Sequence, residues 1–369
     1  MRACNSTHIF TIALFASAWG MPGLAQQLGS APGGRGGGPQ PAVGSMPSRR
    51  FEKIADGVYY ATSTGSMSVG ANSCVIVNDQ DVFVLDPGES PATARALVED
   101  IKTITDKPIK FVANSHFHFD HSHGNQIFGP DVMLIAPDRN YDRLSGRLGN
   151  VLQQQAYATQ ASPALFQQRL DALKAQPPAT DPQQLAMQQR QIAALELRIV
   201  QEKEIKPTPA TLTFSTRVTL HRGNREIQLL YLGRGHTDTD LFVYLPKERI
   251  VCTGDMMESN LSYLADAWVS EWVVALEKLA ALDFDTVLPG HGTPFKGKGK
   301  IRAFQSYLVD LQKQVDALRK QGLSVEETVK RIDLSSHAAD WPNARSINPD
   351  FRAVQRMYDV AADPNAPLR

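Results

Sequence analysis

Residues 116–121 of this chain read His-Phe-His-Phe-Asp-His and directly follow a run of strand-forming residues. Imidazole and carboxylate groups are common ligands of Zn²⁺. Because side chains two residues apart in extended backbone point to the same side, His116 and His118 can hold one ion together. A turn after them can direct Asp120 and His121 towards a second ion. Three of the chain's nine histidines lie in this segment, so it predicts a metal site rather than unrelated structural histidines.

Three more ligand-type residues occur later in the chain, each beside glycine and each after a predicted strand. Glycine has no side chain, so it lets the backbone come close to a crowded site. Any one of these residues alone would fit a turn or a helix cap equally well. Their shared position after strand ends predicts that the fold brings them to the segment 116–121. They are His236 in Gly-His-Thr, Asp255 in Thr-Gly-Asp and His291 in Gly-His-Gly.

Short strands and amphipathic helices are predicted to alternate along most of the chain, which favours helices packed outside sheets. Residues 141–204 differ, because they are rich in Gln, Ala and Leu and contain few strand formers, and two or three inserted helices are predicted there. The predicted strands are 58–60, 74–77, 82–85, 110–113, 211–214, 218–220, 227–232, 241–245, 249–252 and 286–288. The other predicted helices are 94–104 after a cap at Ser90, 268–282, 301–321, and a helix capped by Ser324 that reaches Ile332.

The first fifty residues differ in composition from the rest. Residues 1–25 have a positive start, a short apolar stretch and a small-residue cleavage site, which predicts a signal peptide and a periplasmic or secreted protein. Residues 26–50 form a predicted disordered linker, since eleven of the twenty residues at 29–48 are Gly or Pro. The folded domain is expected at 51–335 with its helical insertion at 141–204, followed by a C-terminal extension at 336–369.

The composition is that of an ordinary globular protein, with 42% hydrophobic and 21% charged residues among 369. Lys plus Arg and Asp plus Glu both total 38, so the formal net charge is zero. Because nucleic acid favours a basic protein face, a small-molecule substrate is expected and a nucleic-acid partner is not. The apolar stretch near the N-terminus is too short for a stable membrane span. Cys74 and Cys252 lie in apolar strand-like runs and are expected to be buried free thiols.

The histidine segment and the three later motifs together resemble the metallo-β-lactamase superfamily over residues 51–295. The set is similar to the complete two-metal set of glyoxalase II and related lactonases. The resemblance implies an α/β fold, an αββα sandwich with a helical insertion, whose site lies at one edge of the two sheets. Zinc β-lactamases of this superfamily carry Cys or Ser where this chain has Asp255, and this departure argues against β-lactamase activity.

The resemblance also implies roles for individual residues. Asp86, at the end of a predicted strand, would orient a metal ligand from behind. Asp255 would bridge two ions, which are expected to be Zn²⁺, although Fe or Mn would also fit because affinity alone does not fix the metal. The first ion would be held by His116, His118 and His236, and the second by Asp120, His121 and His291.

The expected activity is hydrolysis of an ester, thioester, lactone or lactam carbonyl by a metal-bridging hydroxide, since two ions lower the pKa of a shared water. Asp120 or a metal-bound water would protonate the leaving group. Phosphodiester hydrolysis on the same site is one alternative, but export and zero net charge argue against a nucleic-acid substrate. A single-iron oxidoreductase of the same fold is another, and it would not need His121 and His291. The sequence leaves open the substrate, the oligomeric state, and whether the 141–204 helices cover the site or form a dimer contact.

Overall fold

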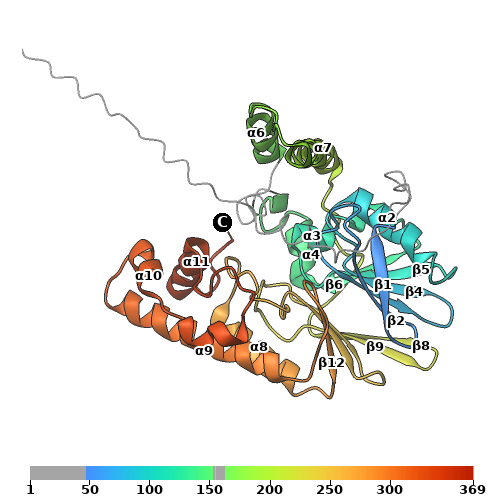
Figure 1. Ribbon diagram of the computed structural model, residues 1–369. Coiled ribbons are helices and arrows are strands. Elements are labelled where there is room, and N and C mark those ends of the chain that lie inside the picture. Colours follow the sequence, from blue (N-terminus) through green and yellow to red (C-terminus); the bar gives the residue numbers. More distant parts are fainter. Residues whose placement is uncertain (1–46, 153, 155–162, 369) are drawn as a thin grey trace, which may run out of the picture. The chain divides into compact units, whose positions relative to one another are not determined.

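Two β-sheets lie face to face and carry helices on their outer sides (Figure 1). The computed structural model describes residues 47–152, 154 and 163–368. The predicted signal peptide, at 1–25, and residues 26–46 of the predicted linker lie outside the described residues.

The first sheet has seven strands in chain order: β1 (Arg49–Ala55), β2 (Val58–Ser63), β3 (Ser73–Val77), β4 (Val82–Leu85), β5 (Ile109–Ala113), β6 (Met133–Pro137) and β7 (Leu212–Phe214). β1 to β4 pair antiparallel, whereas β4 to β7 pair parallel. Leu85 pairs with Ala113 at the carboxyl ends of β4 and β5. The residues that follow these two strands, Asp86 and the histidine segment, therefore start from the same edge of the sheet.

The second sheet has six strands in the spatial order β13 (Phe295–Lys296), β12 (Thr286–Pro289), β11 (Ile250–Gly254), β10 (Phe242–Leu245), β9 (Arg225–Leu230) and β8 (Arg217–Arg222). β11 and β12 pair parallel, and all other neighbours pair antiparallel. Gly254 pairs with Pro289 where the two parallel strands end. This register places Asp255 and His291, which follow these strands, near each other.

Apolar side chains from both sheets form the core between them. Val58 and Tyr60 in β2 both face this core because side chains two apart on a strand point to the same side. Val243 in β10 meets them from the second sheet. Cys74 and Cys252 lie in the same cluster and are not joined by a disulfide, which confirms the predicted buried free thiols.

Helix α2 (Pro91–Ile101) covers the outer face of the first sheet. Its Leu97 packs with Val84 of β4 in a cluster separate from the core between the sheets. Ser90 caps this helix: Ser90 Oγ accepts from the backbone N–H of Thr93 at 3.2 Å. Thr93 Oγ1 accepts in return from the backbone N–H of Ser90 at 3.0 Å. The predicted cap is therefore confirmed.

The outer face of the second sheet is covered by α8 (Val269–Ala280), α9 (Gly299–Lys320), α10 (Val325–Arg331) and α11 (Phe351–Ala362). Trp272 of α8 and Phe304 of α9 are buried in one large cluster with Val287 of β12. Trp341 and Val354 belong to the same cluster, so residues beyond 335 contribute to the core of the domain. With helices on both outer sides, the layers follow the order α, β, β, α, as predicted from the sequence.

The predicted helical insertion contains α6 (Pro163–Lys174) and α7 (Pro182–Glu204), which pack against each other as a hairpin (Figure 1). Arg198 of α7 connects this hairpin to the domain, because its Nη1 lies 2.6 Å from Glu89 Oε1. Its guanidinium also lies 5.7 Å from the ring centroid of Phe119, inside the histidine segment. The hairpin is thus attached beside the predicted site.

The remaining elements are short helices: α3 (Phe119–Ser122), α4 (Asp138–Leu144) and the 3₁₀ helices η1 (Asn125–Ile127) and η2 (Ser335–Asp340). Within the described residues, no helix is both long and apolar enough to cross a bilayer.

Candidate metal centre

The histidine segment leaves the carboxyl end of β5 and enters the short helix α3. Asn114 fixes the turn between them, because its Nδ2 donates to the carbonyl of His121 at 2.9 Å. His116, His118 and His121 are 1%, 5% and 0% exposed. The turn therefore buries all three imidazoles, as a metal site requires.

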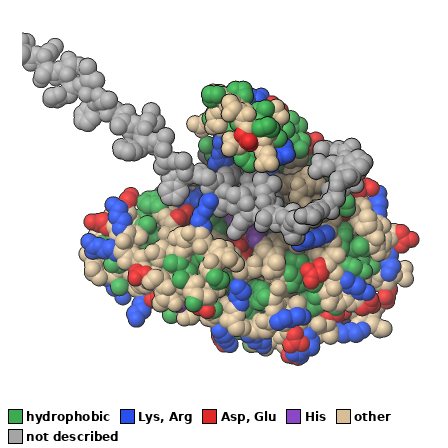
Figure 2. All heavy atoms as spheres, viewed as in Figure 1, with side chains coloured by type: hydrophobic (Ala, Val, Ile, Leu, Met, Phe, Trp, Pro, Cys, Tyr) green, Lys and Arg blue, Asp and Glu red, His purple; other side chains and the backbone are tan. Residues whose placement is uncertain are grey.

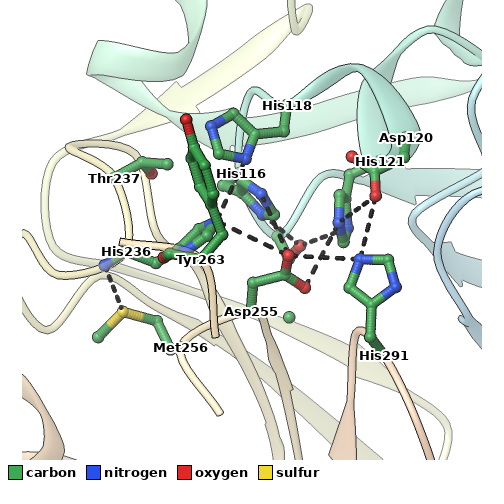
Figure 3. A network of polar contacts seen from close by, with 12 residues as sticks. His116, His118, Asp120, His121, His236, Thr237, Asp255, Met256, Tyr263 and His291 are labelled. Carbon is green, nitrogen blue, oxygen red and sulfur yellow. Dashed lines mark hydrogen bonds and ion pairs between the residues drawn. The ribbon is translucent and has the colours of Figure 1, made fainter. Parts of the chain in front are cut away.

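The three later residues reach this segment from loops that follow β9, β11 and β12 (Figure 3). His236 Nε2 lies 3.1 Å from His118 Nδ1. Asp255 Oδ2 lies 3.7 Å from His236 Nε2 and 3.4 Å from His291 Nε2. His291 Nε2 lies 3.0 Å from Asp120 Oδ2. The structure therefore brings together all seven residues that the sequence analysis selected.

The ligand atoms of these side chains form overlapping groups in which all atoms lie within 4.8 Å of one another. Asp255 stands between the groups: its Oδ1 lies 3.4 Å from His121 Nε2 and its Oδ2 lies 3.9 Å from His116 Nε2. This is the position that a bridging carboxylate would need. The groups are His116, His118 and His236; His116, His121 and Asp255; and Asp120, His121 and His291.

Two glycines lie where any side chain would collide with the site. A Cβ on Gly290 would come closer than 3.0 Å to Asp255 Oδ1, and it would also lie 3.0 Å from the backbone carbon of Gly254 and 3.1 Å from His121 Cε1. Gly254 has a φ of +51°, and a Cβ there would come closer than 3.0 Å to Ser115 Cβ. These glycines let the backbone approach the crowded centre, which is the role expected of them from the sequence.

The imidazoles use their outer ring nitrogens in hydrogen bonds to the protein. His118 Nε2 lies 2.8 Å from Asp266 Oδ2. His236 Nδ1 lies 2.9 Å from the carbonyl oxygen of Tyr263. Because a carbonyl only accepts, His236 carries its proton on Nδ1 and leaves Nε2 free to bind a metal. Partners of this kind hold metal-binding histidines in one orientation and tautomer.

Asp86 supports the opposite side of the site. Its Oδ2 lies 2.9 Å from His121 Nδ1, and its Oδ1 accepts from the backbone N–H of Ser115 at 2.7 Å. Ser115 Oγ in turn lies 3.1 Å from His116 Nδ1. Asp86 has a φ of +59°, which is uncommon for a residue with a Cβ. The backbone of Asp86 is therefore strained, and its buried carboxylate lies where it can orient the ligand His121, as the resemblance implied.

Burial and neighbouring charges divide the site into two electrostatic halves. Burial, with nearby imidazoles, lowers the pKa of His116 well below its usual value and that of His236 to about 3. Both rings are therefore neutral at pH 7, the form that binds metals. Burial alone would raise the pKa of Asp255, but the charges of His291 and His121 outweigh it and hold this pKa well below its usual value. The carboxylate half of the site is therefore ionised.

Three ligand atoms at the centre make no hydrogen bond within the described residues: Nε2 of His116, Nε2 of His121 and Oδ1 of Asp255. A buried polar atom without a partner costs about 1–3 kcal/mol, so these side chains alone leave the site incomplete. Neutral imidazole nitrogens and carboxylate oxygens are the donors that divalent metals accept. The residues present therefore fit a divalent metal.

One supporting residue, Asp266, was not found by the sequence analysis. It lies in the loop between β11 and α8, where its neighbours Leu264 and Ala265 carry no ligand-type side chain. Its role depends on a contact with His118, 148 residues away in the chain. Local sequence therefore contained no signal for it.

Among the seven described residues of the centre, the two most exposed side chains lie next to each other. The side chain of His291 is 35% exposed and that of Asp120 is 13% exposed, whereas the side chains of His116, His118, His121, His236 and Asp255 are at most 7% exposed. In the view of Figure 2, histidine is visible only in a small area between the α6–α7 hairpin and the rest of the surface.

Two curated proteins are similar to this chain in sequence. A linear primary-alkylsulfatase from Pseudomonas sp. (strain ATCC 19151) is 23% identical over 273 residues, which cover 71% of this chain and 50% of that enzyme. A metallo-beta-lactamase type 2 from Bacillus sp. (strain 170) is 35% identical over 83 residues, which cover 21% of this chain and 32% of that protein. The chain thus spans half or less of the length of these two relatives.

Solved structures show the same fold. A stereoselective inverting sec-alkylsulfatase from Pseudomonas sp. superposes with a TM-score of 0.57 at 17% identity, covering 85% of this chain and 50% of that one. The family profile of the metallo-beta-lactamase superfamily matches residues 68–130 and 164–291, together just over half of this chain. This chain belongs to the metallo-beta-lactamase superfamily.

Proposed function

We propose that the chain is a metal-dependent hydrolase that cleaves an ester, thioester, lactone or lactam bond in a small molecule. Membership of the superfamily supports hydrolysis in general. The proposal rests on one observation: the outer ring nitrogens are held by the protein, while ligand atoms at the centre have no partner within the described residues. Structural zinc sites are closed by four ligands, whereas this site offers seven and opens to solvent beside His291.

A pair of bound divalent ions would supply Lewis acidity and a lowered water pKa. The chain's own residues then orient the ligands and move the proton. Asp120 lies on the solvent-accessible side, with its Oδ2 3.0 Å from His291 Nε2. We assign to Asp120 the transfer of a proton from the attacking water to the leaving oxygen, nitrogen or sulfur. The acyl carbon gains the hydroxyl of the water and the leaving group gains the proton, so the reaction balances.

We propose Zn²⁺ as the metal at both positions, with Fe or Mn as further candidates. The group formed by Asp120, His121 and His291 supports a second ion. A single-iron oxidoreductase would not need His121 and His291 as ligands. Elemental analysis of the purified protein tests this point. Two ions per chain are expected, and one iron per chain with no hydrolytic activity would instead support the oxidoreductase.

Sulfate-ester hydrolysis is a second candidate function. It is favoured by the alignment with the linear primary-alkylsulfatase, which covers 71% of this chain, far more than the β-lactamase alignment does. Asp255 stands where zinc β-lactamases carry Cys or Ser, which argues against a lactam as the preferred substrate. The chain spans half the length of that sulfatase.

A substrate panel separates these candidates. The metal-loaded protein is assayed with aryl esters, thioesters, lactones, lactams, primary alkyl sulfates and phosphodiesters at equal concentration. We expect the highest kcat/KM with a carboxylic ester, thioester or lactone. A higher kcat/KM with alkyl sulfates would establish the second candidate, and a highest value with phosphodiesters would overturn both. No turnover of any compound by protein that contains two ions would overturn the hydrolase proposal.

Export to the periplasm or the medium also remains a proposal, supported by the composition of residues 1–25. Expression of the full chain in a Gram-negative host, followed by fractionation and N-terminal mass determination, tests it. A shortened chain in the periplasm or medium is expected. An intact N-terminus in the cytoplasm would contradict export.

A further inference from the structure

A second cavity, of about 600 Å³, lies beside the loop that carries His236. Tyr231, Gly233 and Arg234 from the start of this loop line it, and none of the seven residues of the metal centre does. Its volume is in the range of small-molecule sites. The cavity is therefore separate from the centre, although one loop serves both.

Arginines dominate the polar wall of this cavity. Arg139 and Arg143 share one carboxylate, Asp238: Arg143 binds it through Nε at 3.0 Å and Nη2 at 2.8 Å. Arg139 binds Asp238 Oδ2 through Nε at 3.2 Å and Nη2 at 2.7 Å. In both arginines the Nη1 group makes no hydrogen bond within the described residues. Arg143 is 3% exposed, so it is a buried cation that lines the cavity with an unused pair of donors.

The charges of the wall do not cancel. Arg234 pairs with Glu271, and its Nη1 donates to the carbonyl of Pro364 at 3.0 Å, so this arginine is neutralised. Asp238 neutralises only one of the two remaining guanidinium groups. Three lining arginines against the lining carboxylate of Glu271 and the carboxylate of Asp238, which does not line the cavity, leave one positive charge.

A fourth arginine stands directly behind the wall. Arg356 is 4% exposed and donates to the carbonyls of Ala366 at 2.9 Å and Pro367 at 3.2 Å, two residues that line the cavity. Its Nη2 makes no hydrogen bond within the described residues, and it forms no ion pair there. Burial lowers its pKa to about 10, although Asp266 and Asp238 oppose this, so it remains a cation at pH 7. It adds to the positive potential of the cavity.

We propose that this cavity binds a small oxyanion, whose charged group meets the free Nη1 groups of Arg139 and Arg143. Guanidinium groups recognise carboxylate, sulfate and phosphate oxygens with paired, charge-assisted hydrogen bonds. The volume exceeds that of an inorganic anion, and Leu148 and Ala366 offer an apolar surface, so an organic oxyanion with a short apolar tail fits best. Asp238 lies two residues after His236 in the same loop. An oxyanion bound to Arg139 and Arg143 would therefore contact the two ion-pair partners of a residue in the loop that carries this metal ligand.

Calorimetry on the metal-loaded protein tests the proposal with two probes, sodium sulfate and sodium hexanoate, against sodium chloride at matched ionic strength. Both oxyanions are expected to bind, hexanoate more tightly because of its tail. Sulfate binding with no hexanoate binding would assign the cavity to an inorganic anion, which overturns the organic ligand but keeps the oxyanion site. No oxyanion binding beyond the chloride control would overturn the proposal.

Variants place the binding in this cavity. Arg139→Gln is the test, because the Arg139 side chain is 48% exposed and its loss leaves no buried gap. Arg147→Gln is the matched control, since Arg147 is 65% exposed, pairs with Asp142 and does not line the cavity. Arg139→Gln is expected to weaken binding about tenfold, as loss of hydrogen bonds to a charged group does, and Arg147→Gln to leave it unchanged.

Oxyanions can also bind the metals themselves, and this outcome is distinguishable. Binding at the metal centre would be equal in Arg139→Gln, Arg147→Gln and the parent protein, and that result would overturn the proposal. If Arg139→Gln does not fold, as judged by circular dichroism, Arg139→Lys serves instead. It keeps the charge but lacks the planar fork, and an affinity equal to that of the parent protein would contradict the proposed pairing.

Discussion

Removal of the Asp266 carboxylate should weaken metal binding although Asp266 touches no metal position. Asp266 Oδ2 lies 2.8 Å from His118 Nε2, and the two side chains are 7% and 6% exposed. Replacement of such an outer partner costs about 10- to 100-fold in metal affinity. Since each factor of ten equals about 1.4 kcal/mol, Asp266→Ala should lose about 1.4–2.8 kcal/mol of metal-binding free energy. Asp266→Asn can still accept the hydrogen bond from His118 Nε2 and loses only the negative charge. Its metal affinity should therefore fall by only about tenfold.

Competition with a chromogenic chelator measures this affinity for the parent protein and each variant. Asp131→Ala is the control, because Asp131 is an exposed carboxylate outside the site. Asp266 also lies near the buried Arg356, so thermal unfolding of the metal-free proteins is needed to separate a loss of fold from a loss of affinity. If Asp266→Ala folds and binds metal as tightly as the parent protein, Asp266 does not contribute to metal affinity by orienting His118. Hydrogen bonds to the outer ring nitrogens would then not be what prepares these histidines to bind metal.

Three further predictions concern the site and its loops. Asp255→Ala should lose metal and hydrolytic activity together by more than about 100-fold, because Asp255 stands between the ligand groups, and full metal content with normal turnover would refute the bridging role. Gly290→Ala should also lose metal, since a Cβ there collides with Asp255 Oδ1, whereas Gly129→Ala, with open space around it, should not; elemental analysis compares the two. Burial alone would raise the pKa of Asp238, but its two arginine partners hold this pKa below the usual value of 3.8. The ionised carboxylate therefore stabilises the folded state fully above pH 3.8. This contribution to the free energy of unfolding is lost as the pH falls through the lower pKa of the folded state. Asp238→Asn should therefore cost about 3 kcal/mol in urea unfolding at pH 7 and less at pH 3, and equal costs at both values would contradict the ion pair.

Much of the fold could be predicted because its signals are local. Alternating or continuous apolar runs marked β2 to β5 and β7 to β12, and the capping residues Ser90 and Ser324 marked two helix starts. β6 was not predicted: Met133–Pro137 is a five-residue apolar run, and a run that short does not distinguish a strand from a buried helical turn. Val354 of α11 belongs to the main cluster, and the residues beside it in the sequence carry no pattern that would predict this contact with a distant surface.

The sequence by itself determined which residues stand at the strand ends, since His116 to His121, His236, Asp255 and His291 are each marked by ligand chemistry and by the strand or glycine beside them. The tertiary structure decided what surrounds them. Asp266 meets His118, and the arginines of α4 meet Asp238, only because the packing of two sheets brings into contact segments that are 95 to 148 residues apart in the chain. A contact of that kind depends on the docking of whole elements, so no local pattern of residues encodes it.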